Sequence, residues 1–228
     1  MTKIAFIAAL PRELKPLVRR WRHECRNGVE IWRHDRNQHE WVAACAGIGE
    51  KAALKALAEV ENDGPVGQIY STGYAGALRE NLKAGQVFHI CGVVDAQTGE
   101  RFVSADQSTN CWLVTSRIVV DKIEKSRLAS RYEASLVDME AAALARLAST
   151  RRIPFHSVKA VSDALVDGLP EVGRFIAADG KFDSLRFTRS VLVRPWRWRA
   201  LIRLAQNSNR AAKNIRLALL AIMENATP

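Results

Sequence analysis

Residues 137–146, VDMEAAALAR, place two carboxylates at the start of an Ala-rich helical run. Asp138 and Glu140 flank Met139, and apolar residues follow. Acidic side chains are favourable at a helix N-terminus because they complement the helix dipole. Two carboxylates at this place can also bind the hydroxyl groups of a sugar. The segment therefore indicates either an ordinary acidic helix start or part of a substrate site.

Other polar residues follow apolar, strand-like runs in the same way. Glu13 comes after one run, Asp163 ends another, and a glycine-containing segment follows a third. In an open α/β sheet, ligands bind beyond the carboxyl ends of the strands. We therefore expect one cleft lined by residues 11–13, 47–50, 73–76, 115–117, 138–140 and 162–163.

Each of these residues also has an ordinary structural explanation. Asp163 would cap the helix that follows it, and Glu13 would be a solvated helix carboxylate. Gly73 and Gly76 would form a tight turn. No single position therefore distinguishes a structural role from a functional one. The combination of these positions does.

The elements that would position these residues alternate between strands and helices. Apolar runs predict strands at 3–9, 30–34, 40–46, 67–78, 85–102 (with a turn at 97–99), 111–116, a short one before 138, and 154–163. Helical spacing predicts helices after Pro11, at 47–61, 121–132 and 139–152, and two basic amphipathic helices within 195–225, broken near QNSN (206–209). This alternation predicts an α/β fold in which helices cover both faces of a mixed, mostly parallel sheet.

The composition limits the class of protein. The chain has 228 residues and four cysteines without a C-x-x-C pair, so it predicts one domain over 1–228 with neither a metal nor a cofactor. No apolar run approaches the roughly 18 residues of a spanning helix. The expected location is the cytoplasm, and the inner face of the membrane if the basic tail binds lipid.

The net charge of +10 is concentrated near the C-terminal end, where arginines alternate with Trp and aliphatic residues over 186–216. An anionic membrane surface or nucleic acid is a candidate partner, and a solvated basic face is the alternative. Nucleic acid is disfavoured because no recognised nucleic-acid-binding motif is present.

The segment AGIGEKA at 46–52 matches the dinucleotide fingerprint G-x-G-x-x-A. The acidic residue that should bind the ribose about 20 positions later is missing, because that region reads IYST. Gly47 and Gly49 are better explained as positions where the backbone approaches a ligand or a strand.

Five segments together resemble a known family. AFIAALPREL, AGIGEKAA, STGYAGAL, LVDMEAAALA and VKAVSDAL occur in the order and approximate spacing of the purine nucleoside phosphorylase superfamily. They are most similar to its methylthioadenosine/S-adenosylhomocysteine nucleosidase branch, over roughly residues 3–180. The resemblance implies a three-layer α/β/α sandwich, a homodimer and cleavage of a nucleoside.

The resemblance also implies roles for individual residues. Glu13 would activate the attacking water, Glu140 would bind the ribose hydroxyls, Met139 would lie under the sugar, and Asp163 would protonate the leaving purine. Asp138 stands where the family often has Glu, so its role is less defined. The remaining substrate-binding positions that the resemblance implies are Ala9, Gly73, Ala75, Gly76, Val119, Val120 and Ser162.

The residue types suit this chemistry on physical grounds as well. Breaking an N-glycosidic bond passes through an oxocarbenium-like state, which needs a general acid at the base and an anion near the sugar. Asp163 in an apolar pocket would carry the proton, and Glu140 would stay ionised at the helix N-terminus.

Two departures from the pattern of the family leave the identity of the substrate undecided. Tyr74 replaces a small residue of the family, and LVTSRIVVDKI lacks the usual Ser-Gly-Asp pattern. Residues 93–102 and 194–219 are more similar to the hopanoid-associated phosphorylase group, which implies an adenosylhopane substrate.

The loop ALPREL has no glycine and places Glu13 where phosphate would bind, which favours water as the nucleophile. Arg12 and Arg117 could bind a phosphate, so phosphate stays an alternative nucleophile. The predicted function is hydrolytic release of adenine from a 5′-substituted adenosine. The alternatives are a phosphorolytic enzyme and an inactive nucleoside-binding module.

Overall fold

The computed structural model describes residues 1–118, 120–163 and 198–226, except for the side chains of 198–201. Val119, one of the expected substrate-binding residues, lies outside this part of the chain. The elements are, in order, β1 (Thr2–Ala8), α1 (Pro11–Val18), β2 (Arg22–Arg26), β3 (Val29–Arg36), β4 (His39–Cys45), α2 (Glu50–Glu61), β5 (Gln68–Ala77), β6 (Val87–His89), β7 (Gly92–Asp95), β8 (Arg101–Val103), β9 (Trp112–Thr115), α3 (Lys122–Tyr132), β10 (Leu136–Asp138), α4 (Ala141–Arg151), β11 (Phe155–Asp163) and α6 (Trp198–Asn225).

The strands form one mixed sheet. Its central strands are parallel: β1 pairs with β4 and β5, β5 pairs with β11, and β9 pairs with β7 and β10. The antiparallel pairs are β2 with β3, β3 with β4, β7 with β8, β6 with β11, and β5 with β10. The carboxyl ends of β1, β5 and β11 therefore meet at one edge, where the sequence predicts the site.

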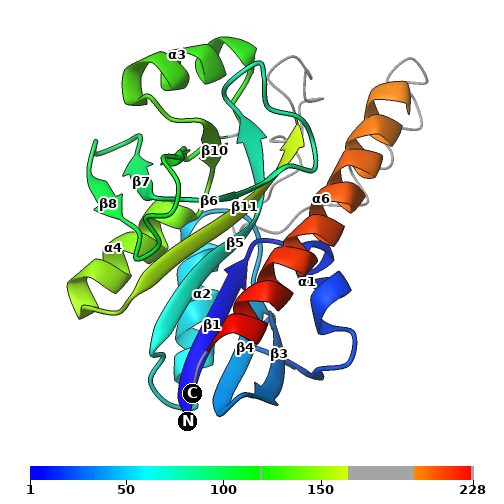
Figure 1. Cartoon of the computed structure of the whole chain (residues 1–228), viewed down its shortest axis with the longest axis vertical. Coiled ribbons are helices and arrows are strands. Elements are labelled where there is room, and N and C mark those ends of the chain that lie inside the picture. The colour runs from blue at the N-terminus through cyan, green and yellow to red at the C-terminus, as the bar shows by residue number, and fades with distance from the viewer. Residues whose placement is uncertain (119, 164–197, 227–228) are drawn as a thin grey trace.

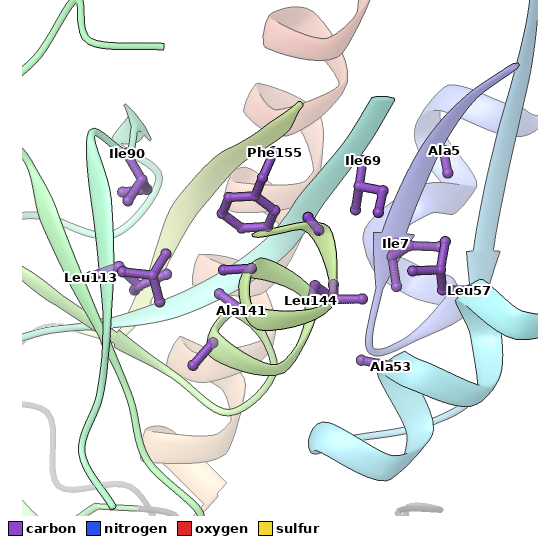
Figure 2. Close-up of a cluster of buried hydrophobic side chains, with 14 of the residues drawn as sticks. Ala5, Ile7, Ala53, Leu57, Ile69, Ile90, Leu113, Ala141, Leu144 and Phe155 are labelled. Carbon is purple, nitrogen blue, oxygen red and sulfur yellow. The ribbon is translucent and has the colours of Figure 1, made fainter. Parts of the chain in front are cut away.

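Helices cover both faces of this sheet, which confirms the expected α/β sandwich. On one face, Leu57 of α2 and Leu144 of α4 share a core with Ile7 of β1 (Figure 2). On the other face, Leu14 of α1 and Ile215 of α6 share a core with strand residues such as Phe6. Figure 1 shows α6 running across the strands beside α1, with α2 behind them. Successive residues of β1 thus point into different layers, as the two-residue period of a strand requires.

The C-terminal region differs from the expectation of two helices broken near QNSN. Helix α6 is continuous from Trp198 to Asn225 and passes through QNSN. Ser208 of this segment is buried, and it lies on the same face as Ala211, Ala212 and Ile215, which pack into the core. The prediction was wrong because burial of this face outweighs the low helix propensity of two asparagines and a serine.

The predicted long strand within 85–102 is also interrupted. It is divided into β6 and β7 by Ile90 and Cys91, and β8 follows the turn at 96–99. The predicted strands at 30–34 and 40–46 correspond to β3 and β4, and a further strand, β2, pairs with β3. These differences lie away from the edge where the carboxyl ends of β1, β5 and β11 meet.

Candidate active site

A cavity of about 180 Å³ lies at the carboxyl ends of the central strands. Residues from five of the six expected segments line it, and Ile118 and Val120 line it in place of 115–117. The lining residues are Ala9, Leu10, Arg12, Glu13, Ile48, Tyr74, Ala75, Gly76, Ile118, Val120, Lys125, Val137, Asp138, Met139, Glu140, Ser162, Asp163, Leu204 and Ser208. Gly73 does not line the cavity, but it lies beside Glu13, which does.

Glu13 lies in the first turn of α1 and is almost fully buried, with 4% of its surface exposed. One carboxylate oxygen accepts hydrogen bonds from the backbone N–H groups of Ala9 (2.9 Å) and Leu10 (3.0 Å). The other accepts a bond from the N–H of Tyr74 at 3.3 Å. Burial raises the pKa of Glu13, and the bond from Leu10 opposes that rise. Glu13 is therefore a positioned, partly desolvated carboxyl at the cavity wall.

Gly73 makes room for this carboxyl. It has a φ of +119°, and a Cβ atom built on it would lie 2.8 Å from Oε2 of Glu13. A side chain at position 73 would therefore push Glu13 out of its place. This explains the first glycine of STGYAGAL by a contact within the site rather than by a tight turn.

Asp138 ends β10 and is fully occupied by protein partners. It accepts hydrogen bonds from Thr115 Oγ1 (2.7 Å) and from the N–H of Ala141 (3.0 Å), and it forms an ion pair with Lys159 Nζ at 2.9 Å. Burial lowers the pKa of Lys159, but Asp138 and Glu140 outweigh that effect and raise it. Besides the binding role expected from the sequence, Asp138 has a structural role, because it accepts a hydrogen bond from the first residue of α4.

Glu140 is held by the glycine motif at the start of α2. Its Oε1 accepts a hydrogen bond of 2.7 Å from the N–H of Gly49, whose φ of +96° suits glycine. Burial, followed by the charge of Asp138, raises the pKa of Glu140 to about 7. Burial therefore opposes the ionised form of Glu140 that a helix N-terminus favours, and the expected ionised form is only partly populated near pH 7.

Asp163 ends β11 and is buried, but its surroundings are not the expected apolar ones. Its Oδ1 accepts a hydrogen bond from Ser162 Oγ at 2.7 Å. Its Oδ2 forms an ion pair of 2.5 Å with Nζ of Lys125 on α3. Both charged side chains are buried, with Asp163 at 4% and Lys125 at 2% exposed. Asp163 is therefore a buried partner of an ammonium at the cavity.

Sequence reasoning missed both buried lysines, although each left a signal. Lys125 shares the spacing of Leu128 and Tyr132, which are the buried residues of α3. Lys159 lies within the apolar run of β11, where nearly every residue is buried. A lysine at either kind of position needs an anionic partner, because burying an unpaired charge is costly.

Arg12 and Arg117, the two residues that leave phosphate as an alternative nucleophile, occupy different places. Arg117 is directed to Asp95 (2.9 Å) and Glu50 (2.8 Å) and does not line the cavity. Arg12 lines the cavity, and its guanidinium lies 5.6 Å from the centre of the Tyr74 ring. Tyr74 also lines the cavity, beside Arg12.

The rest of the wall is mostly apolar and includes α6, which sequence reasoning did not assign to the site. Ile48, Met139, Ile118, Val120 and Leu204 contribute aliphatic and thioether groups. Leu204 and Ser208 reach the cavity because α6 packs along β11 and β5. The cavity therefore combines buried carboxylates with an apolar side, a surface suited to a sugar joined to apolar groups.

No cluster of three or more His, Cys, Asp or Glu side chains with the arrangement of a metal site occurs in the described ranges. Four carboxyl groups, from Glu13, Asp138, Glu140 and Asp163, line the cavity, together with the ammonium of Lys125. Such a set stabilises positive charge that develops on a bound molecule.

Comparison with known proteins agrees with this fold. Residues 108–184 match the family model of the phosphorylase superfamily. The chain also superposes on solved nucleosidases over nearly its whole length. It has the fold of the phosphorylase superfamily. The matched segment contains both the DMEAAALA block and Asp163.

Three structures with this phosphorylase-superfamily fold illustrate the similarity. S-adenosylhomocysteine nucleosidase from Streptococcus pyogenes, in complex with 5-methylthiotubericidin, has a TM-score of 0.75 at 20% identity and covers 100% of this chain and 98% of its own. A mutant of the Helicobacter pylori methylthioadenosine nucleosidase with 5′-methylthioadenosine in the active site has a TM-score of 0.74 at 14% identity, covering 99% and 100%. Futalosine hydrolase from Helicobacter pylori gives the same TM-score, identity and coverage. No curated protein matched the chain in a sequence search.

Proposed function

We propose that the protein hydrolyses the N-glycosidic bond of an adenine nucleoside with a substituent at its 5′ carbon and releases adenine. The observation that carries this proposal is the convergence of Glu13, Glu140 and Asp163 on one cavity. The solved structures with the same fold add support, because they include nucleosidases with 5′-methylthioadenosine or 5-methylthiotubericidin bound.

The chemistry assigns the carboxyl groups to different parts of the substrate. Cleavage gives an oxocarbenium-like sugar, which is stabilised by nearby anionic or hydrogen-bonding carboxyl groups. Glu140 and Met139 would bind the ribose, and Glu13 would receive a proton from the attacking water. Asp163 would pass a proton to the leaving base.

Water is favoured over phosphate as the nucleophile. A phosphate would need free backbone N–H groups in the loop after β1, together with a cation. The N–H groups of Ala9 and Leu10 in that loop donate to Glu13 instead. Arg117 is held by Asp95 and Glu50. A phosphate bound in this loop would therefore have to displace the buried carboxylate of Glu13 from these N–H groups, and its negative charge would lie close to that of Glu13.

The apolar side of the cavity supports an apolar group at the 5′ position. Leu204 of α6, Ile118 and Val120 line the same cavity as Met139, the residue expected under the sugar. A 5′-alkylthio group or the hopane of an adenosylhopane would suit this chemistry. The adenosylhopane alternative comes from the similarity of residues 93–102 and 194–219 to the hopanoid-associated group.

The test is release of free base from a panel of adenosines with 5′-hydroxyl, 5′-methylthio and longer 5′-alkyl groups. Chromatography would detect adenine and the sugar product, with and without added phosphate. The Asp163→Asn variant is the matched control, because an amide keeps the shape but is a far weaker acid. We expect adenine and free ribose from the wild type, and loss of turnover with retained ligand binding in the variant.

Other outcomes would support different functions. Ribose 1-phosphate as the product would establish phosphorolysis, for which Arg12 at the cavity is the favourable feature. Tight nucleoside binding without release of any base would indicate the inactive binding module. Near wild-type turnover by Asp163→Asn would show that Asp163 is not the acid.

Two further parts of the proposal concern the setting of the enzyme. We expect a homodimer, from the resemblance to the nucleosidases, and contact between the basic C-terminal region and an anionic membrane surface at the cytoplasmic side. No helix in the described ranges has the length and hydrophobicity needed to cross a membrane.

A further inference from the structure

The ion pair between Lys125 and Asp163 conflicts with a simple role for Asp163 as an acid. Both carboxylate oxygens already accept hydrogen bonds, one from Ser162 Oγ and the other from Lys125 Nζ. The contact of 2.5 Å between Nζ and Oδ2 is a charge-assisted hydrogen bond. Lys125 is the donor of this bond, so one of its N–H groups is directed at Asp163.

We propose that Lys125 supplies the proton that the leaving base receives through Asp163. The inference rests on the proposed function. As the bond between C1′ and the base nitrogen breaks, its electron pair stays with the base. Lys125 passes its proton to the carboxylate of Asp163, and Asp163 passes that proton on to the base, so the pair ends as a neutral amine beside a carboxylate. Water adds its hydroxyl to C1′ and gives its proton to Glu13, and exchange with solvent then restores Glu13 and Lys125.

The packing around the pair supports a dedicated arrangement. A Cβ atom on Gly76 would lie 3.2 Å from Oδ2 of Asp163 and 3.4 Å from Cε of Lys125. The absence of a side chain at position 76 thus leaves space that the two charged groups fill. This gives the second glycine of STGYAGAL a role in the site.

No other neighbouring charged group among the described residues is paired with Asp163 as Lys125 is. Ser162 is a very weak acid, and a guanidinium such as that of Arg12 does not release its proton in proteins. The buried ammonium of Lys159 is paired with Asp138 and does not line the cavity. The other titratable or charged side chains in the described lining are Arg12, Glu13, Tyr74, Asp138 and Glu140. Lys125 is the ammonium whose proton points at Asp163.

The test compares Lys125→Met and Lys125→Arg with the wild type on two substrates. One is the nucleoside from the panel that the wild type cleaves best. The other is 4-nitrophenyl β-D-ribofuranoside, whose nitrophenolate leaves without a proton. Lys122→Met, an exposed lysine on the same helix, is the matched control. Arginine preserves the positive charge but cannot give up a proton, so it separates charge from proton donation.

We expect both Lys125 variants to lose on the order of 10²- to 10⁴-fold in kcat on the nucleoside, the usual contribution of a positioned acid. The loss on the nitrophenyl riboside should be at least tenfold smaller. In Lys125→Met, Asp163 must carry its own proton, so the alkaline limb of the kcat profile should move to lower pH. Thermal melting of each variant checks that it folds.

Three results would overturn the inference. The first is a Lys125→Arg variant with near wild-type turnover of the nucleoside, which would show that only the charge matters. The second is an equal loss on both substrates, and the third is an alkaline limb that does not move. Failure of the proposed function looks different, because the wild type itself would then release no base from any nucleoside.

Discussion

Glu13 shows how a single glycine can control the position of a buried carboxyl in the candidate site. We expect Gly73→Ala to reduce turnover by at least tenfold, because its Cβ would overlap Glu13, which is hydrogen-bonded to Ala9 and Leu10. The substitution also introduces backbone strain at a φ of +119°. Gly99→Ala is the matched control, since Gly99 has a φ of +78° and no atom within 4 Å of an added Cβ.

Both glycine variants should lose some stability, measured by urea unfolding, from the shared strain. Only Gly73→Ala should lose steady-state turnover of the nucleoside. If Gly99→Ala lost as much turnover, the effect would come from general destabilisation and not from the position of Glu13.

The buried carboxyl of Glu140 makes stability depend on pH. Its pKa is about 7 in the folded protein, against 4.5 for an unperturbed glutamate, because of burial and then the charge of Asp138. The folded state therefore binds a proton at Glu140 more tightly than the unfolded chain does. This contribution to stability is fully present below about pH 4.5 and is lost as the pH rises through about 7.

The free energy of unfolding should thus fall by up to about 3 kcal/mol from this group between pH 4.5 and 8. Glu140→Gln should remove that part of the pH dependence, while Glu80→Gln on the surface should keep it. Urea unfolding at pH 5 and pH 8 measures the difference. An unchanged dependence on pH in Glu140→Gln would show that the folded protein does not hold a proton there.

At the scale of elements, α6 joins the C-terminal region to the site. Leu204 lines the cavity with Ile118 and Val120, whereas Leu217 on the same helix is exposed. We expect Leu204→Ala to raise KM for 5′-alkyl nucleosides by about tenfold, from lost apolar contact, and to affect 5′-hydroxyl adenosine less. Leu217→Ala is the control and should change neither value.

Comparison of KM across the panel measures this effect. An equal rise for substituted and unsubstituted adenosine would place Leu204 away from the 5′ group. A rise in the Leu217→Ala control would point instead to a loosened helix.

The sequence predicted the elements best where one local pattern decides them. The strands at β1 and β11 and the helix α2 follow from their apolar spacing, and the polar residues after β1 and β11 meet as expected. Helix α6 could not be predicted as one element, because the helical state of QNSN depends on burial of the face that carries Ser208, Ala211 and Ile215. Tertiary packing of this kind overrides local propensity.

The site was predictable in its carboxylates and less so in their partners. Carboxylates after strands mark the carboxyl edge of a sheet, which sequence order alone reveals. The pairing of Lys125 with Asp163 joins α3 to β11, residues that lie 38 positions apart. Such pairing depends on where α3 packs, and no local pattern of residues contains that information.

At the scale of the whole molecule, the net charge of +10 calls for an anionic neighbour or a strongly solvated face. The structure places the apolar face of α6 against the sheet through Ala211, Ile215, Leu219 and Met223. That face is therefore not free to enter a bilayer. The outer face carries the exposed residues Ile202, Arg203, Arg210, Lys213, Arg216 and Leu217.

Within the described residues, this outer face is the part of α6 that a membrane would contact, and binding through it depends on charge more than on insertion. Arg194, Trp196 and Arg197 lie outside the described residues. Each basic residue near an anionic surface contributes about 1 kcal/mol, and salt screens the attraction. We expect the protein to co-sediment with vesicles that contain phosphatidylserine at low salt, and to bind neutral vesicles weakly. Reversing Arg203, Lys213 and Arg216 to Glu should abolish the binding and leave turnover of a soluble nucleoside unchanged. Absence of binding to anionic vesicles at low salt would remove the membrane proposal and leave the arginines as a solvated face.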